Sequence, residues 1–127
     1  MKNNIIRENG IDYHYLDLSM YKTDKLTEIQ IKRTWKEFIK DKEYTKVLLQ
    51  KKRGVVINEI MYFKNGKLHN EFNWADEKIF LNFVERKYYL NGKEILNLDE
   101  KSWTEYVINW RRYNTLKEIL KDKNASL

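Results

Sequence analysis

Few residues in this chain of 127 are of the types that do acid–base or nucleophilic chemistry. It has two histidines, His14 and His69, and no cysteine, so disulfides, thiolate metal sites and cysteine nucleophiles are excluded. The sequence contains no His-x₃-His, no carboxylate cluster and no Gly-x-Ser-x-Gly motif, so zinc and serine-hydrolase chemistry have no support. Metal-independent ribonucleases need only a Lys, an Arg, a Tyr and a His or Glu, which nearly every basic protein of this size contains. We therefore expect a protein that is not an enzyme and uses no metal or cofactor, with a ribonuclease-type toxin as the third candidate function.

The net charge of +6 suggests a polyanionic partner. Only six of the 25 basic residues are arginine, however, and the abundance of Lys, Asn, Ile, Tyr and Phe is typical of an AT-rich genome. Two basic clusters stand at expected strand ends, and together they would form one basic rim for phosphates. They consist of Lys51, Lys52 and Arg53, and of Arg86 and Lys87. The alternative is that these charges only keep the turns soluble.

A second candidate surface lies on the last predicted helix. At about 100° per residue, Ile108, Arg112 and Ile119 share its outer face, and Arg111 lies beside them. Apolar residues that flank an arginine on an outer face are typical of a protein-binding surface. The alternative is that another layer of the fold covers these residues.

Repeated turns position the elements that hold these residues. Asn-Gly, the strongest short hairpin signal, occurs at residues 9–10, 65–66 and 91–92. The sequence predicts an α+β fold in a single domain, with an N-terminal β-hairpin at 4–18, a helix at about 24–43, an antiparallel β-meander at 45–98 and a C-terminal amphipathic helix at 102–122 packed on the sheet. In the first hairpin, a two-residue turn places Arg7 opposite Asp12 and Ile6 opposite Tyr13.

Apolar spacing refines these elements. In the first helix, Ile31, Trp35, Phe38 and Ile39 share one face. After the second Asn-Gly turn, a return strand is expected with one buried face (Leu68, Phe72 and Trp74) and one solvated face (His69, Glu71 and Asn73). Residues 79–84 are expected to form another strand. The last helix should start at a capping box, Ser102-x-x-Glu105, and bury the stripe Trp103, Tyr106, Val107, Trp110 and Tyr113 against the sheet.

Residues 62–69 read Tyr-Phe-Lys-Asn-Gly-Lys-Leu-His, and residues 88–93 read Tyr-Tyr-Leu-Asn-Gly-Lys. Over residues 61–95 the chain resembles the Asn-Gly-Lys-Leu-His β-hairpin repeat (MORN-like) proteins of phages and bacteria. The Gly-Pro-Ala that usually follows the His is replaced by residues 70–75, Asn-Glu-Phe-Asn-Trp-Ala. The resemblance implies a non-enzymatic β-hairpin module, often found in phage-borne or toxin–antitoxin settings, with no catalytic residues to transfer.

Two function classes remain open. The first is a protein-binding module, a phage or mobile-element inhibitor of a bacterial defence complex (anti-CRISPR-like), whose partner is a protein or ribonucleoprotein complex of the host. The second is a basic RNA- or DNA-binding module that uses exposed Lys and Tyr on the sheet. The sequence has no signal peptide and no run of about 20 apolar residues, so we expect a cytoplasmic protein without a membrane partner. The oligomeric state cannot be read from the sequence.

Overall fold

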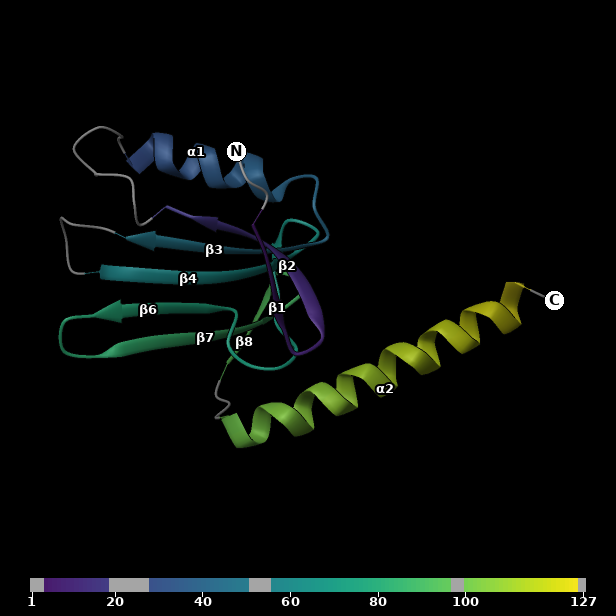
Figure 1. Ribbon diagram of the computed structural model, residues 1–127. Helices are drawn as coiled ribbons and strands as arrows, with labels where there is room; N and C mark the ends of the chain where they lie inside the picture. Colours follow the sequence, from purple (N-terminus) through teal and green to yellow (C-terminus); the bar gives the residue numbers. More distant parts are fainter. Residues whose placement is uncertain (1–3, 19–27, 51–55, 97–99, 126–127) are drawn as a thin grey trace. The chain divides into compact units, whose positions relative to one another are not determined.

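The computed structural model describes residues 4–18, 28–50, 56–96 and 100–125 (Figure 1). The fold is α+β, as the sequence predicts, and the chain divides into two compact units, residues 1–96 and 97–127. The first unit holds a sheet and one helix, and the second holds the long C-terminal helix. We describe the two units separately, and the single domain stays a prediction.

Eight strands form the sheet in the described part of the chain, in the order β1-β2-β3-β4-β6-β7-β8, with β5 paired only to β4. The elements in chain order are β1 (Asn4–Glu8), β2 (Ile11–Asp17), α1 (Glu28–Ile39), β3 (Tyr44–Gln50), β4 (Val56–Lys64), β5 (Lys67–Leu68), β6 (Asp76–Phe80), β7 (Val84–Leu90), β8 (Lys93–Ile95) and α2 (Glu100–Ala125). From β3 onwards every pairing is antiparallel, which confirms the predicted meander.

The N-terminal hairpin is confirmed with its register, since Arg7 lies opposite Asp12 and Ile6 opposite Tyr13. It does not stand apart from the meander, because β2 pairs with β3 in parallel and joins the hairpin to the main sheet. A parallel pair needs a long crossover connection, and here the connection contains α1. This parallel pair was not expected from the sequence.

The core of the first unit lies between α1 and β2, β3 and β4. Buried side chains of β3 and β4, the residue that follows β2 and the last residue of α1 form it, namely Leu18, Ile39, Val47, Leu49, Met61 and Phe63. Ile31, Trp35 and Phe38 of α1 pack against this cluster, which confirms the predicted buried face of the helix. The rings of Trp35 and Phe63 stack at 5.6 Å.

The two Asn-Gly hairpins of the repeated phrase contact each other directly. Asn65 and Asn91 have φ near 50°, and each is followed by a glycine at positive φ, as a type I′ turn requires. The backbone N–H of Asn91 donates to Nδ1 of His69 at 2.9 Å, and the N–H of Gly92 donates to the Leu68 carbonyl at 2.8 Å. The end of the first repeat therefore holds the turn of the second.

The predicted return strand is wrong beyond Leu68, because residues 69–75 form a loop. Asn70 folds this loop with its own side chain. Its Oδ1 accepts from the N–H groups of Phe72 and Asn73, and its Nδ2 donates to the Trp74 carbonyl. Such local side-chain bonds compete with strand pairing. The assignment of faces fails with it, since His69 is buried and Phe72 is exposed.

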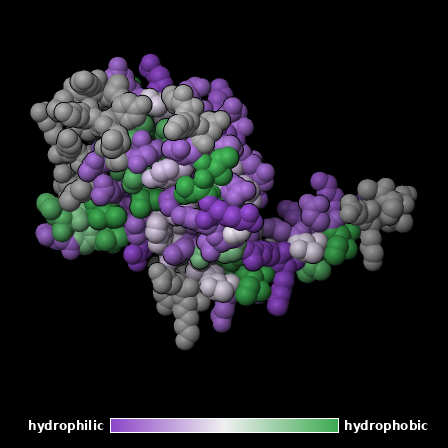
Figure 2. Space-filling view, in the orientation of Figure 1, coloured by the Kyte–Doolittle hydropathy of each residue, from purple (hydrophilic) through white to green (hydrophobic). Residues whose placement is uncertain are grey.

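The predicted strand at 79–84 is also wrong, because β6 ends at Phe80 and β7 starts at Val84. Residues 81–83 turn the chain, with the Phe80 N–H donating to the Phe83 carbonyl and the two rings stacked at 4.3 Å. The apolar run is not a buried strand, since 82% of the Leu81 surface is exposed. Figure 2 shows this turn as a hydrophobic patch at the left end of the molecule.

The helix limits differ from those expected. The first helix ends at Ile39 rather than at residue 43. Just past this end, Nζ of Lys42 donates a hydrogen bond to the Phe38 carbonyl. Residues 24–27, at the expected start of the helix, lie outside the described residues. The second helix runs from residue 100 to residue 125 rather than from 102 to 122, so Ser102 lies inside its first turn and not at its cap.

The predicted stripe on α2 is only partly buried. Trp103 and Val107 are buried and Trp110 is half-buried, but Tyr106 and Tyr113 are exposed. Apolar residues also occur on other sides of the helix, among them the exposed Ile108. The apolar side chains of α2 are therefore spread over several sides of the helix. The prediction that they form one buried stripe is wrong for Tyr106 and Tyr113.

Replacing His69 by Ala should reduce the free energy of unfolding by about 1–3 kcal/mol. The reason is that the Asn91 N–H would lose its hydrogen-bond acceptor, the buried His69 ring. His14, half-buried in β2, is the matched control, and His14→Ala should cost clearly less. Urea denaturation of both variants measures the difference. Equal losses would show that the hydrogen bond between the two hairpins adds no stability.

Candidate functional sites

The four residues predicted for protein binding all lie on the surface of α2. Ile108 and Ile119 are 41% and 50% exposed, and Arg111 and Arg112 are exposed as well. At 100° per residue, Ile108, Arg112 and Ile119 fall within about 40° of one another around the helix axis. The helix thus brings the predicted residues together on one side.

The exposed apolar surface of α2 is wider than the sequence analysis expected. Six exposed apolar side chains, which we call the apolar face of α2, extend over about 160° of the helix surface; they are Tyr106, Ile108, Tyr113, Leu116, Ile119 and Leu120. Tyr106, Tyr113 and Leu120 are seven residues apart, and Leu116 falls between the last two, which is the spacing of a helix that packs along another helix. That seven-residue interval was the sequence signal for Leu116 and Leu120, which were missed, and for the exposure of Tyr106 and Tyr113, which were expected to be buried.

The structure does not bring the described part of the basic rim to one face. Arg86 and Lys87 are neighbours in β7, so their side chains point to opposite faces of the sheet. Nε of Arg86 contacts Oε2 of Glu77 at 2.7 Å, and Nζ of Lys87 contacts Oε1 of Glu85 at 3.4 Å. Each cation is therefore already paired with a carboxylate. Lys51, Lys52 and Arg53 lie outside the described residues.

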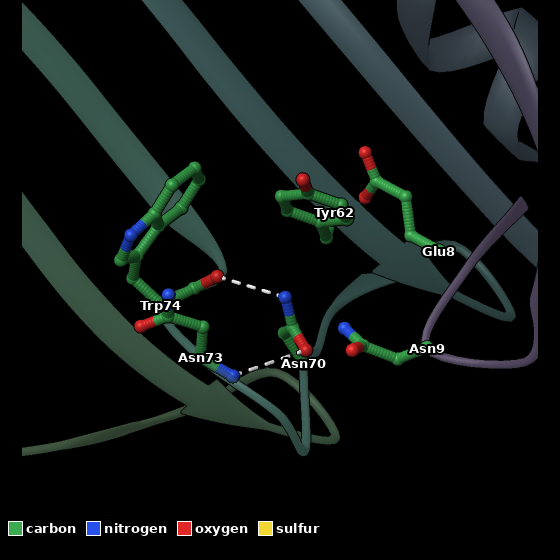
Figure 3. A pocket seen from close by; sticks show the side chains of 6 residues that line it. All are labelled: Glu8, Asn9, Tyr62, Asn70, Asn73 and Trp74. Carbon is green, nitrogen blue, oxygen red and sulfur yellow. Dashed lines mark hydrogen bonds between the residues drawn. The ribbon is translucent and has the colours of Figure 1, made fainter. Parts of the chain in front are cut away.

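A polar hollow of about 370 Å³ lies where the first hairpin meets the loop after β5. Its lining comes from three places, β1 and its turn, β4, and the loop at 69–75, as Figure 3 shows; the residues are Glu8, Asn9, Tyr62, Asn70, Asn73 and Trp74. The bonds of Asn70 to the loop backbone hold Asn73 and Trp74 in place. None of the six was predicted as a site residue, because segments more than 50 residues apart build the hollow.

Aromatic rings form one wall of this hollow. The rings of Tyr62 and Trp74 meet edge to face at 5.5 Å, and Tyr13 meets Tyr62 in the same manner at 5.4 Å. Burial raises the pKa of the Tyr62 hydroxyl, and the hydrogen-bonding carboxylate of Glu8 raises that pKa further. Nζ of Lys46 contacts Oε1 of Glu8 at 2.8 Å and lies over the Tyr62 ring. The wall thus consists of aromatic rings in edge-to-face contact, beside an ion pair between Lys46 and Glu8.

The tyrosines of the sheet are poorly placed for stacking with nucleic-acid bases. Tyr13, Tyr62 and Tyr88 are buried, while Tyr15 and Tyr44 are half-buried. Stacking on a base requires an open ring face beside basic side chains. The sheet therefore offers little of the exposed aromatic surface on which the nucleic-acid reading depends.

His69 is a structural residue in this fold. It is buried, its Nδ1 accepts from the Asn91 N–H, and its Nε2 lies 3.3 Å from Oε2 of Glu71. Because a backbone N–H can only donate, Nδ1 carries no proton and Nε2 is the protonated nitrogen. Both ring nitrogens are thus occupied within the protein.

The described residues contain neither a metal-binding cluster nor a helix that could span a membrane. No group of three or more His, Cys, Asp or Glu side chains in them is arranged to hold a metal ion. None of the helices in the same part of the chain has the length and hydrophobicity needed to cross a bilayer.

Comparisons with protein-family models, with curated proteins and with solved structures found no match to this chain. The resemblance of residues 61–95 to MORN-like hairpin repeats therefore stays a prediction.

A pair of carboxyl groups lies between β4 and β6. Asp76 is buried, and burial, followed by the hydrogen bond and charge of Glu59, raises the pKa of Asp76 to about 7. Lys78 and Lys87 oppose this shift. Among the described residues, Oδ1 of Asp76 has no hydrogen-bond partner. The carboxyl group of Asp76 is therefore easier to bury protonated than charged.

The folded chain binds the Asp76 proton more tightly than the unfolded chain, whose aspartate has the ordinary pKa of 3.8. The resulting stability is full below pH 3.8 and is lost as the pH rises through about 7. Asp76→Asn should therefore raise the free energy of unfolding at pH 8 by on the order of 2 kcal/mol and change it little at pH 4. Denaturation of both proteins across this range is the measurement, and a gain of equal size at the two pH values would contradict it.

Proposed function

We propose that this chain is a non-enzymatic protein-binding module and that α2 provides its contact surface. The proposal rests on the apolar face of α2, on which six apolar side chains are exposed along one helix. Isolated exposed apolar residues are ordinary, but a contiguous set on one element is typical of an interaction surface. Hydrophobic side chains are also visible on α2 in Figure 2.

The charges of α2 indicate what kind of partner it would take. Between residues 102 and 121 the exposed cations Arg111, Arg112, Lys117 and Lys121 outnumber the carboxylates of Glu105 and Glu118. The seven-residue spacing of Tyr106, Tyr113 and Leu120 suits a second helix packed alongside. The partner is therefore an amphipathic helix of a host protein or ribonucleoprotein complex, with acidic residues beside its apolar face.

The biological setting is proposed from the hairpin repeat. Residues 61–95 resemble repeats of phage and bacterial proteins, so the module is a phage or mobile-element inhibitor of a bacterial defence complex. A small protein that occupies a helix of such a complex would block it without chemistry of its own. The nucleic-acid alternative is less favoured, because Arg86 and Lys87 are paired with carboxylates and several sheet tyrosines are buried.

The test compares a variant that places Asp on the apolar face of α2 with a control that places Asp at an exposed apolar residue of the sheet unit. Ile108→Asp combined with Ile119→Asp should weaken binding to a purified partner, identified by copurification, at least about tenfold. Leu81→Asp, at the exposed turn between β6 and β7, is the matched control and should retain the affinity. Isothermal titration calorimetry measures both. Full affinity in the α2 variant would reject α2 as the contact surface.

A third variant separates the protein-binding proposal from its alternative. Reversing the charges of Lys51, Lys52 and Arg53 should leave partner binding unchanged, because these residues belong to the predicted phosphate rim and not to α2. If binding were lost only in this variant, and fell steeply with salt, counterion release from nucleic acid would explain it. That result would replace the protein-binding proposal with the nucleic-acid one.

A further inference from the structure

The polar hollow beside Tyr62 offers no positive charge to a ligand. Of its six lining residues only Glu8 is ionisable at neutral pH, and Lys46 pairs with it at 2.8 Å. A phosphate or carboxylate ligand would meet the Glu8 carboxylate and no free cation in the lining. Because Lys46 already neutralises Glu8, the lining offers no unpaired charge to a cation either, so the ligand that suits this hollow is uncharged.

Two asparagines with unused amides line the hollow from separate segments. Asn9 comes from the β1–β2 turn and Asn73 from the loop after β5 (Figure 3). In the described part of the chain neither side-chain amide has a hydrogen-bond partner, whereas the amide of Asn70 is used up by the loop backbone. Each free amide has N–H donors and a carbonyl acceptor, and a hydroxyl group can both accept from the former and donate to the latter.

The opposite wall is aromatic. In Figure 3 the Trp74 and Tyr62 rings lie on one side of the hollow, with the asparagines on the other. Trp74 is half-buried, so part of its surface is open to a ligand. A site with an apolar wall and a few fixed polar groups is typical of small-molecule recognition, and about 370 Å³ lies at the small end of such sites.

We propose that this hollow binds a neutral saccharide through one pyranose ring. The C–H face of the sugar packs on Trp74, and hydroxyls at different positions of the ring bond to the amides of Asn9 and Asn73 and to the carboxylate of Glu8. A nucleotide is disfavoured by the absence of a free cation among the six lining residues. This site is separate from α2 and goes beyond the protein-binding proposal.

The experiment titrates the isotope-labelled full-length protein with glucose, galactose and N-acetylglucosamine, each in turn, and follows NMR signals. At least one sugar should shift the side-chain amide signals of Asn9 and Asn73 and the indole N–H signal of Trp74, with one saturable dissociation constant. Asn9→Ala and Asn73→Ala should each weaken that affinity at least about tenfold. Removal of the Asn73 side chain spares its backbone bond to Asn70.

The control is Asn82→Ala, an exposed asparagine in the turn between β6 and β7, which should keep the affinity of the unmodified protein. The proposal is overturned if none of the three sugars gives a saturable shift, or if Asn9→Ala and Asn73→Ala bind as tightly as Asn82→Ala. It is also overturned if adenosine or uridine, titrated in parallel, saturates these signals and the sugars do not.

Discussion

The pair His69–Asn70 links the two Asn-Gly hairpins by hydrogen bonds, in addition to the pairing of β4 with β6 and of β6 with β7 that joins the halves of the meander. His69 receives the Asn91 N–H of the second Asn-Gly turn, and the Asn70 N–H donates to the Tyr89 carbonyl at 3.2 Å. The Asn70 side chain then folds the loop that places Asn73 and Trp74 in the polar hollow. Two adjacent residues thus connect the repeated hairpins and shape the hollow, so the candidate ligand site depends on the hydrogen bonds between the repeats.

The two candidate surfaces have different physical characters. The apolar face of α2 is exposed, extended along one helix and flanked by cations, which suits a large partner that buries much surface. The hollow at Tyr62 is small, polar and neutral, and rigid ring contacts form its wall. They also belong to different compact units of the chain. Mutations at one surface should therefore leave the other unchanged.

Local chemistry made the turns predictable. An Asn-Gly pair fixes both the turn type and the register, so the pairing of Arg7 with Asp12 and of Phe63 with Leu68 could be foreseen from the sequence. The loop at 69–75 could not, because apolar alternation predicts a strand there while the Asn70 side chain satisfies the backbone instead. The parallel pairing of β2 with β3 was also missed, since a long connection separates these strands and no local signal specifies their contact. Helical spacing alone groups the predicted α2 residues on one side, so their alignment could be foreseen, whereas the hollow depends on tertiary contacts.

The second Asn-Gly hairpin lacks the residues with which the first one holds its neighbour. In the second copy, Glu94 stands where Leu68 stands in the first, and Ile95 stands where His69 stands. A third hairpin would find no imidazole acceptor for the N–H of its turn, and the strand that it would meet, β8, has only three residues and includes the charges of Lys93 and Glu94. Such short, charged edges discourage further strand addition. The second copy therefore lacks the His69-type acceptor with which the first copy holds its neighbour, and its short, charged strand is a poor partner for another hairpin.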